Sequence, residues 1–382
     1  DHQSLWLRKC RALGLLARQI ALFLQIRRKR SGLLHVSQKA GKTILHWGAG
    51  RESEIFQGSF GICFKKYQPF SWEAFWVLFS IVGVLCIPHI WAAIEVPHYM
   101  TYVLATPTKT LCLGALAGFF WGVSSIWYSR AIDMIGVSMV TGVNLGLSNL
   151  LGSLVPMAIL HTTPTAKVLT VLLIGQAILL IGVAVLSKAG FIKNEDSNGG
   201  SASTEDKSTK SGGVFVKGLI LALASGAGSA AINIGASASN YPVNLAVADG
   251  VNATSASLLS WVVVFFGGFI ANFGYAMIKL IKNKTYVNYV QPGCGKAYFK
   301  VLLTSFVWFA ALAVYGKATA LFGAYGPSIG WVAFNGLALI IANIWGFRDG
   351  EWKGFAKARN VALLGNAVII VALVVVGISN SL

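Results

Sequence analysis

The sequence predicts an all-α polytopic membrane protein, a bundle of about ten transmembrane helices in two inverted five-helix repeats. Three observations carry this prediction. Of the 382 residues, 55% are hydrophobic and only 12% are charged, whereas a soluble domain usually carries about a quarter charged residues. Apolar segments long enough to cross a bilayer follow one another closely, and a polar Gly/Ser-rich segment divides them into two halves. The length leaves no room for a separate catalytic domain, so we do not expect an enzyme.

Residues 1–53 form a basic N-terminal tail that differs from the rest of the chain. The tail contains the run Arg27-Arg28-Lys29-Arg30 and almost no acidic residues. Three interpretations stay open: a processed targeting segment, a basic helix on the membrane surface, or a non-native or disordered tail.

The apolar segments define the expected helices in order. The first, 55–64, is short and follows charges at 51, 52 and 54, so we expect a truncated first helix. The other spans are expected at 72–96, 111–132, 138–160, 168–186, 216–235, 255–281, 299–321, 328–345 and 361–378. The chain therefore divides into a first helical repeat (54–187), a linker (188–215) and a second helical repeat (216–382).

Charge and spacing predict how the two halves are related. Lysine and arginine gather in the linker and in the loops on its side of the membrane, which predicts a cytoplasmic linker. Five helices per half give the halves opposite orientations, which is typical of secondary transporters with a substrate site at the interface of the repeats. A shift of 187 residues supports a repeat through these pairs: Trp121 and Trp308, Tyr128 and Tyr315, Arg130 and Lys317.

Other patterns concern packing and excluded ligands. Gly114, Gly118 and Gly122 are spaced four apart, which predicts close helix packing in lipid. The net charge of +18 resides in loops and the tail, so nucleic acid is not an expected partner. The cysteines and histidines show no metal-ligand spacing. We therefore expect no metal and no cofactor.

Several segments resemble one transporter family. They are FKKYQPFSWE (64–73), the stretch 114–143 with Trp121 and Tyr128, KGLILALASG (217–226), Trp308 with Tyr315, and Gly350-Glu351-Trp352. In this order they resemble the L-rhamnose–proton symporter family of the drug/metabolite transporter superfamily, from about residue 57 to the C-terminus. The resemblance implies ten helices, inverted repeats, and proton-driven uptake of L-rhamnose or a related 6-deoxy sugar by alternating access.

The resemblance also sets the expected partners and the alternatives. The partners are a small sugar, protons and the lipid bilayer, and a homodimer is a possible assembly. Residues before 57 depart from the family's first helix. Two alternatives therefore stay open: another transporter of the superfamily, for a nucleotide-sugar, drug or metabolite, and a degenerate copy that transports nothing.

Polar and aromatic side chains inside the spans are the candidate sugar ligands. An amide both donates and accepts hydrogen bonds, as sugar hydroxyls require. The candidates with polar side chains are Gln57, Asn144, Ser148 and Asn335. The aromatic candidates are Trp121, Tyr128, Trp308 and Tyr315, which equally fit the membrane interface. Inter-helix hydrogen bonding is the alternative for each amide.

Proton coupling needs a titratable group that both sides of the membrane can reach in turn. No carboxylate occupies the middle of a predicted span. Glu73, near the start of the span 72–96, is the first candidate, and His89, which follows Pro88 in that span, is the second. A solvated helix end is the alternative for both.

Overall fold

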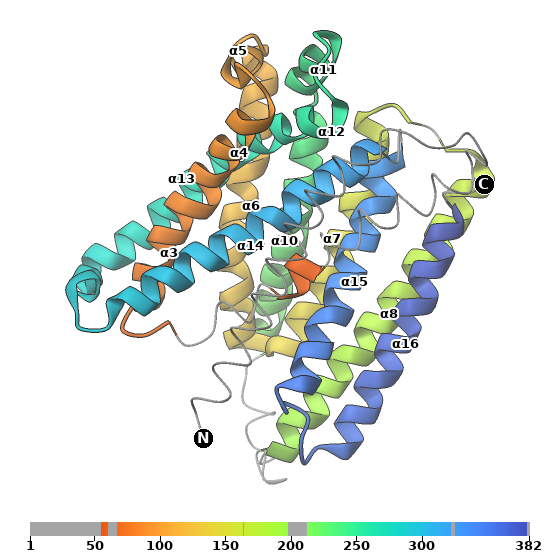
Figure 1. The fold of residues 1–382 in the computed structure, drawn as a ribbon. Coiled ribbons are helices and arrows are strands. Elements are labelled where there is room, and N and C mark those ends of the chain that lie inside the picture. The colour runs from red at the N-terminus through yellow and green to blue at the C-terminus, as the bar shows by residue number, and fades with distance from the viewer. Residues whose placement is uncertain (1–54, 60–66, 163, 198–211, 322–324, 380–382) are drawn as a thin grey trace, which may run out of the picture. The chain divides into compact units, whose positions relative to one another are not determined.

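The protein is described by a computed structural model, which covers residues 55–59, 67–162, 164–197, 212–321 and 325–379. All of these ranges belong to one compact unit, 46–382. Each regular element within them is a helix (Figure 1). The basic tail and most of the short first segment, including its charges at 51, 52 and 54, lie outside the described residues.

Nine helices of the described ranges are long and apolar enough to cross a membrane. These spans are Trp72–Glu95, Thr108–Ile135, Met139–Ile159, Ala166–Lys193, Gly213–Ala248, Ala253–Lys282, Cys294–Leu321, Gly326–Arg348 and Ala356–Ser379. They match the nine long apolar segments of the sequence one for one. The predicted all-α polytopic fold is therefore confirmed.

The first long span consists of three helical pieces. It runs through α3 (Trp72–Phe79), the π-helix η1 (Ser80–Cys86) and α4 (Ile87–Glu95). The Ser71 hydroxyl accepts from the amide of Ala74 and so caps the start of α3. Pro88 lies in the first turn of α4, directly after η1, and its missing N–H removes one backbone hydrogen bond from the continuous span. A π-helix inside a longer helix often marks a functional site.

The remaining elements complete the bundle. The long helices are α6 (Thr108–Ile135), α7 (Val137–Ile159), α8 (Ala166–Ser197), α10 (Gly212–Ala238), α13 (Leu258–Lys282), α14 (Cys294–Leu321), α15 (Gly326–Arg348) and α16 (Ala356–Ser379). The short connecting elements are α5 (Tyr99–Leu104), α11 (Tyr241–Ala248), α12 (Ala253–Ala256) and the 3₁₀ helix η2 (Thr285–Val290).

The helices extend beyond the apolar segments from which they were predicted. Helix α8 continues to Ser197, although the sequence places the end of this span at 186 and the start of the linker at 188. Helix α10 likewise begins at Gly212 instead of 216. Hydropathy reports where the bilayer ends, whereas backbone hydrogen bonding can continue a helix into water.

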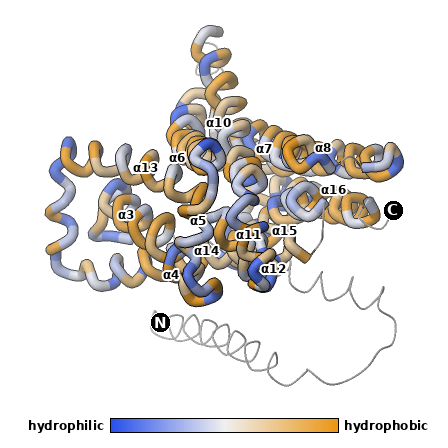
Figure 2. Tube along the Cα trace, turned by 90° about the horizontal axis from the view of Figure 1, so that it is seen from above, coloured by the Kyte–Doolittle hydropathy of each residue, from blue (hydrophilic) through white to orange (hydrophobic). Residues whose placement is uncertain are grey.

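Small residues bring neighbouring helices into close contact. Helix α8 lies beside α16, and α6 lies between α10 and α13 (Figures 1 and 2). A Cβ added to Gly118 would approach the carbonyl oxygen of Val264 to 1.7 Å. Added Cβ atoms at Gly182 and Gly365 would meet the facing helix in the same way, at 2.6 and 2.8 Å. The predicted close packing at the glycines of residues 114–122 is thus confirmed.

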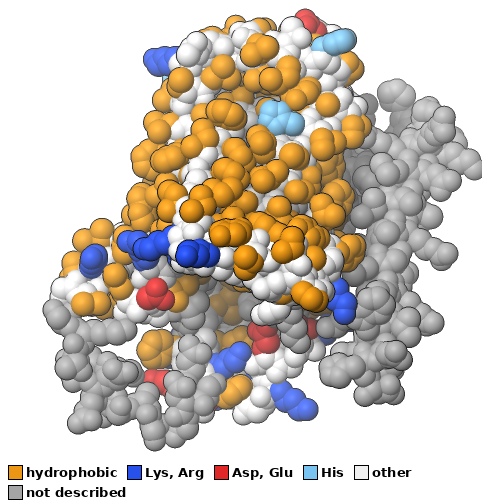
Figure 3. Space-filling view, turned by 90° about the vertical axis from the view of Figure 1, so that its left-hand side faces the viewer, with side chains coloured by type: hydrophobic (Ala, Val, Ile, Leu, Met, Phe, Trp, Pro, Cys, Tyr) orange, Lys and Arg blue, Asp and Glu red, His pale blue; other side chains and the backbone are white. Residues whose placement is uncertain are grey.

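The bundle has two chemically different ends. We call the end that carries α5, α11 and α12 the α11 end, and the end that carries η2 the η2 end (Figure 1). Lys279 and Lys282 lie in the last turn of α13, at the η2 end. Figure 3 shows lysine and arginine side chains gathered in a band below a broad hydrophobic surface. Large apolar side chains such as Ile94 and Ile278 are well exposed, as lipid contact requires.

Candidate functional site

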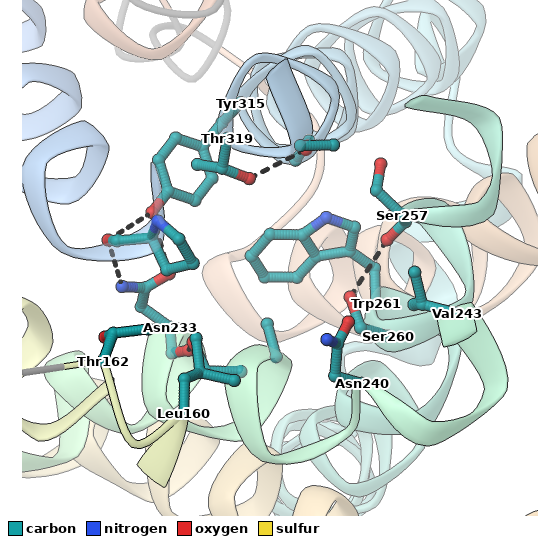
Figure 4. Close-up of a pocket in the computed structure, with 15 residues that line it drawn as sticks. Leu160, Thr162, Asn233, Asn240, Val243, Ser257, Ser260, Trp261, Tyr315 and Thr319 are labelled. Carbon is teal, nitrogen blue, oxygen red and sulfur yellow. Dashed lines mark hydrogen bonds between the residues drawn. The ribbon is translucent and has the colours of Figure 1, made fainter. Parts of the chain in front are cut away.

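A cavity of ≈ 310 Å³ lies near the α11 end, among helices of the second half of the chain and the residues that follow α7 (Figure 4). Its size is at the lower limit of small-molecule pockets, which is about 300 Å³. The polar and aromatic side chains that line it are Thr162, Asn233, Ser237, Asn240, Ser257, Ser260, Trp261, Tyr315 and Thr319. They come from α10, α13, α14 and the connections next to α7 and α11.

One side of the cavity is built on the pair Asn233 and Tyr315, both buried. The Tyr315 hydroxyl donates to Asn233 Oδ1 at 2.8 Å and also lies 3.1 Å from the carbonyl oxygen of Pro327. Asn233 Nδ2 donates to the carbonyl oxygens of Gly152, at 2.7 Å, and Pro327, at 3.0 Å. This network joins α7, α10, α14 and the start of α15. It therefore holds polar groups at fixed positions beside the cavity.

Trp261 lies in the middle of the lining and is 1% exposed (Figure 4). Its indole Nε1 has no hydrogen-bond partner among the described residues. The absence of a side chain at Gly316 leaves room for this group, because an added Cβ would lie 2.5 Å from Nε1. The indole ring stacks on Phe265, with centroids 5.6 Å apart. A fixed aromatic ring with a free donor suits a ligand that has both apolar and hydroxyl surfaces.

The hydroxyls of Ser257 and Ser260 lie on the side opposite Asn233 (Figure 4). Each bonds to the backbone of its own helix: Ser257 Oγ donates to Thr254 O at 2.8 Å, and Ser260 Oγ donates to Ser257 O at 3.0 Å. Their oxygens can still accept a hydrogen bond from a ligand. The cavity thus combines amide, hydroxyl and indole groups, and none of the described residues that line it carries a charged side chain.

The predicted aromatic residues separate into two kinds of environment. Tyr315 lines the cavity. Trp121 and Trp308 stack on each other, with centroids 5.5 Å apart and an interplanar angle of 17°, in the aromatic core around Phe265. The hydroxyl of Tyr128 lies 2.7 Å from Thr141 Oγ1 and so links α6 to α7. None of Trp121, Tyr128 and Trp308 contributes to the cavity lining.

The predicted amides on α7 and α15 bond between helices. Asn144 Nδ2 donates to the hydroxyls of Ser225, at 2.9 Å, and Ser229, at 3.1 Å, on α10. Asn335 Nδ2 donates to Asn149 Oδ1 at 2.9 Å, which connects α15 to α7. Ser148 is buried, and its backbone oxygen accepts from Trp331 Nε1 at 3.1 Å.

Gln57 lies in the short helical segment 55–59, and this segment packs on α15. A Cβ added to its neighbour Gly58 would lie 2.6 Å from the side chain of Ile341. Trp345 Nε1 donates to Ser59 Oγ at 2.9 Å. Gln57 Oε1 is buried and has no partner among the described residues. Its carbonyl is thus available to a group outside the described ranges or to a ligand.

The two proton-coupling candidates lie at different depths of one span. Glu73 is the second residue of α3, at the η2 end, and its Oε1 accepts from Asn283 Nδ2 and Thr285 Oγ1, both at 2.9 Å. His89 Nδ1 lies 3.0 Å from the hydroxyl of Tyr99.

Tyr289 in η2 donates to the Ala74 carbonyl oxygen at 3.0 Å. Burial, with added repulsion from Tyr298 and Glu73, raises the pKa of Tyr289 to about 12, so its hydroxyl remains a donor at physiological pH.

Four residues in or beside the site were not among the sequence candidates. Asn233 is an amide inside a predicted span, so the signal that selected Asn144 could have found it. Nothing in the sequence singles out Trp261, because the lack of a partner for its indole N–H is visible only in the structure. Glu95 and Lys317, an ion pair next to the cavity, lie near the ends of their spans, where charges are usually solvated.

Comparisons with known proteins place the chain in a family. A sequence model described as L-rhamnose-proton symport protein matches residues 48–381. The match begins nine residues before residue 57, where the resemblance in the sequence begins. The L-rhamnose-proton symporters of Cronobacter sakazakii and Shigella dysenteriae are 28% and 29% identical to the chain over 327 residues. These alignments cover 82% of the chain and 91% and 92% of the two relatives.

A similar relative occurs in Escherichia coli, where an L-rhamnose-proton symporter is 28% identical over 82% of the chain and 92% of its own length. The family match covers both halves of the chain and all nine long spans. The chain therefore belongs to the L-rhamnose-proton symport protein family and is an integral, multi-pass membrane transporter.

Proposed function

We propose that this protein takes up L-rhamnose, or a closely related 6-deoxy sugar, together with protons by alternating access. The cavity beside Tyr315 and Asn233 carries this proposal: its amide and hydroxyl groups suit the hydroxyls of a sugar, and Trp261 suits its C–H and methyl surface. The names of the relatives agree with this substrate. They do not favour the alternative of a nucleotide-sugar, drug or other metabolite.

We further propose that the two halves are inverted repeats. The pairing of their helices supports this: α6 packs on α13 of the second half, and α14 packs on α3, η1 and α4 of the first. Two residues at equivalent positions also meet each other, since Trp121 stacks on Trp308. A two-fold axis that relates the halves would produce the same contact twice in this way, once from each half.

The inverted repeat suggests a role for the candidates that lie outside the cavity. Tyr128 occupies on α6 the position that Tyr315 occupies on α14, towards the other end of the bundle. When the transporter opens to the opposite side, Tyr128 and the neighbouring polar residues of α7, including Asn144, become the equivalents of the present lining. Gln57, Ser148 and Asn335 remain predicted ligands, and the homodimer remains a prediction.

We propose that the η2 end faces the cytoplasm. Lys279, Lys282, Lys284 and Lys296 lie at or near this end, where positive charge is favoured in cytoplasmic loops. The end of α8 and the start of α10 lie on the same side by helix count. The cavity near the α11 end would then be the site that is reached from outside.

The test is transport into proteoliposomes that contain the purified full chain. We expect labelled L-rhamnose to accumulate when the outer solution is acidic, and we expect unlabelled 6-deoxy sugars to compete better than sugars with a 6-hydroxyl. Tyr315→Phe and Asn233→Ala should raise the half-saturating sugar concentration about tenfold, since each removes a group that positions the lining.

The controls separate the cavity from other tyrosines. Tyr286→Phe, on the exposed face of η2, should transport like wild type. Tyr128→Phe should affect release on the opposite side more than it affects sugar affinity from outside. Transport of L-rhamnose that is insensitive to Tyr315→Phe and Asn233→Ala would contradict the assignment of the cavity.

A further inference from the structure

An ion pair joins the two halves of the chain next to the cavity. Glu95 is the last residue of α4, and its Oε1 accepts from Lys317 Nζ on α14 and, at 2.7 Å, from Trp91 Nε1. Its Oε2 accepts from Ser255 Oγ of α12 at 2.8 Å. One carboxylate thus holds three helices at the α11 end. Both charged side chains are 23% exposed, so water reaches the pair without fully solvating it.

The pair is directly connected to the cavity lining. Gly316, Thr319 and Ala320, which line the cavity, flank Lys317 on the last turns of α14. Ser257, another lining residue, follows Ser255 by two positions. Lys317 Nζ also lies over the Trp91 ring, 5.7 Å from its centroid. The pair therefore adjoins two sides of the cavity.

Protonation changes what this pair can do. The carboxylate takes up one proton and becomes a neutral carboxylic acid, while Lys317 keeps its ammonium group. The attraction that holds α4 to α14 and α12 is then lost, and Lys317 gains by turning to water. An ion pair that is partly buried and joins two moving halves can couple proton binding to opening.

Few other titratable groups face Glu95. In the described residues, α12 carries none, and the titratable groups of α13 lie on its last turns at the η2 end. On α14, Lys296, Tyr298 and Lys300 lie near its start at the η2 end, and Tyr315 points into the cavity. Cys86 in η1 and His89 in α4 belong to the same span as Glu95. Lys317 is therefore the facing charge that responds to the protonation of Glu95.

We infer that Glu95 binds the transported proton and that its pair with Lys317 is a latch that closes the cavity at the α11 end. This inference rests on the proposed function, because it assigns the proton of the same transport cycle. Glu95 is thus a third candidate for proton coupling beside Glu73 and His89. Unlike these two, it would act together with a cation, Lys317. The π-helix η1 lies in the same span, and π-helical turns inside longer helices are frequent at functional sites.

The test compares two assays on the same proteoliposomes. Accumulation of labelled L-rhamnose in an acid-outside gradient requires coupling, whereas exchange of labelled for unlabelled L-rhamnose without a gradient requires only the sugar site. We expect Glu95→Gln to lose accumulation at least tenfold and to keep exchange within about twofold of wild type. Exchange by Glu95→Gln should also be independent of pH.

A double variant removes both charges and so leaves no unpaired charge. Glu95→Gln combined with Lys317→Gln should behave like Glu95→Gln in both assays. Asp249→Asn, an exposed carboxylate at the same end, is the matched control and should transport like wild type. Accumulation that survives in Glu95→Gln, or exchange that is lost in both Glu95 variants, would overturn the latch.

A third readout does not need the sugar. The ion pair exists only while Glu95 is ionised, so acid should lower the unfolding temperature of the wild type more than that of the double variant. A wild-type chain that exchanges no L-rhamnose but shows this difference would refute the proposed function and leave the latch standing. Equal acid sensitivity of the two proteins would refute the latch.

Discussion

The two ends of the span 72–95 each present a glutamate to the second half of the chain, but the two carboxylates are held by different partners. Glu73 accepts hydrogen bonds from the neutral side chains of Asn283 and Thr285. Glu95 accepts from the cationic Lys317 as well as from Trp91 and Ser255. A carboxylate with neutral donors can be protonated with little rearrangement. One that pairs with a cation cannot, because protonation leaves the cation without its partner.

The two ends of this span are held to the rest of the bundle by different kinds of contact. The contacts around Glu73 tie α3 to η2, and Tyr289 adds a further bond to the backbone of this helix. The contacts around Glu95 tie α4 to the helices that line the cavity. The π-helix η1 lies between them. We therefore expect the η2 end to depend on hydrogen bonding and the α11 end to depend on charge.

The largest effect should follow from removing the cation. Lys317→Met leaves the carboxylate of Glu95 half-buried and unpaired, and we expect it to lower the free energy of unfolding by about 1–3 kcal/mol. Tryptophan fluorescence during thermal unfolding of the detergent-solubilised protein measures this loss. Lys109→Met, which removes an exposed lysine at the same end, is the control. Equal stability of the two variants would remove the distinction between the ends.

A smaller effect is expected for the neutral substitution at the other end. Glu73→Gln keeps an Oε1 that accepts from Asn283 and Thr285, so the loss in unfolding free energy should stay below about 1 kcal/mol. Gradient-driven accumulation of L-rhamnose sharpens the comparison. We expect Glu73→Gln to keep accumulation that Glu95→Gln loses. The reverse outcome would assign the proton to Glu73, the first candidate of the sequence, and would exchange the roles of the two ends.

The smallest effects should come from single hydroxyl donors. Thr285→Val and Ser255→Ala each remove one hydrogen bond to a carboxylate that keeps other donors, at a cost of about 1 kcal/mol or less. Thr285→Val should cost more, because Glu73 is 7% exposed and has less access to water than Glu95. Parallel thermal unfolding of the two variants measures the order. A larger loss of stability for Ser255→Ala would show that the contact with α12 contributes more to the stability of the α11 end than we infer.

The sequence could predict what the bilayer imposes. A segment that crosses lipid must be apolar over its length, so the nine long spans were visible in hydropathy alone. Close helix contacts require small residues, so Gly114, Gly118 and Gly122 indicated packing before the partner helix was known. The ends of α8 and α10 were placed less well, because a helix does not have to end where the lipid does.

The site could be predicted only in part. Amides and aromatics inside spans are a correct chemical signal, and it selected Tyr315, which lines the cavity. It also selected Asn144 and Asn335, whose side chains bond between helices in this structure, and it did not select Asn233. The same residue type serves packing or binding according to which helix it faces. A single sequence does not contain that information.

The sequence by itself determined the class of protein, the spans and the family resemblance, because these follow from the length and order of apolar segments and from local motifs. Only the tertiary structure decided that Asn233, Trp261 and Tyr315 share one cavity and that Glu95 meets Lys317, which lies 222 positions further along the chain. Such contacts depend on how helices distant in sequence rotate and pack against each other. In lipid, that choice is made by side-chain fit and by the need to pair every buried polar group.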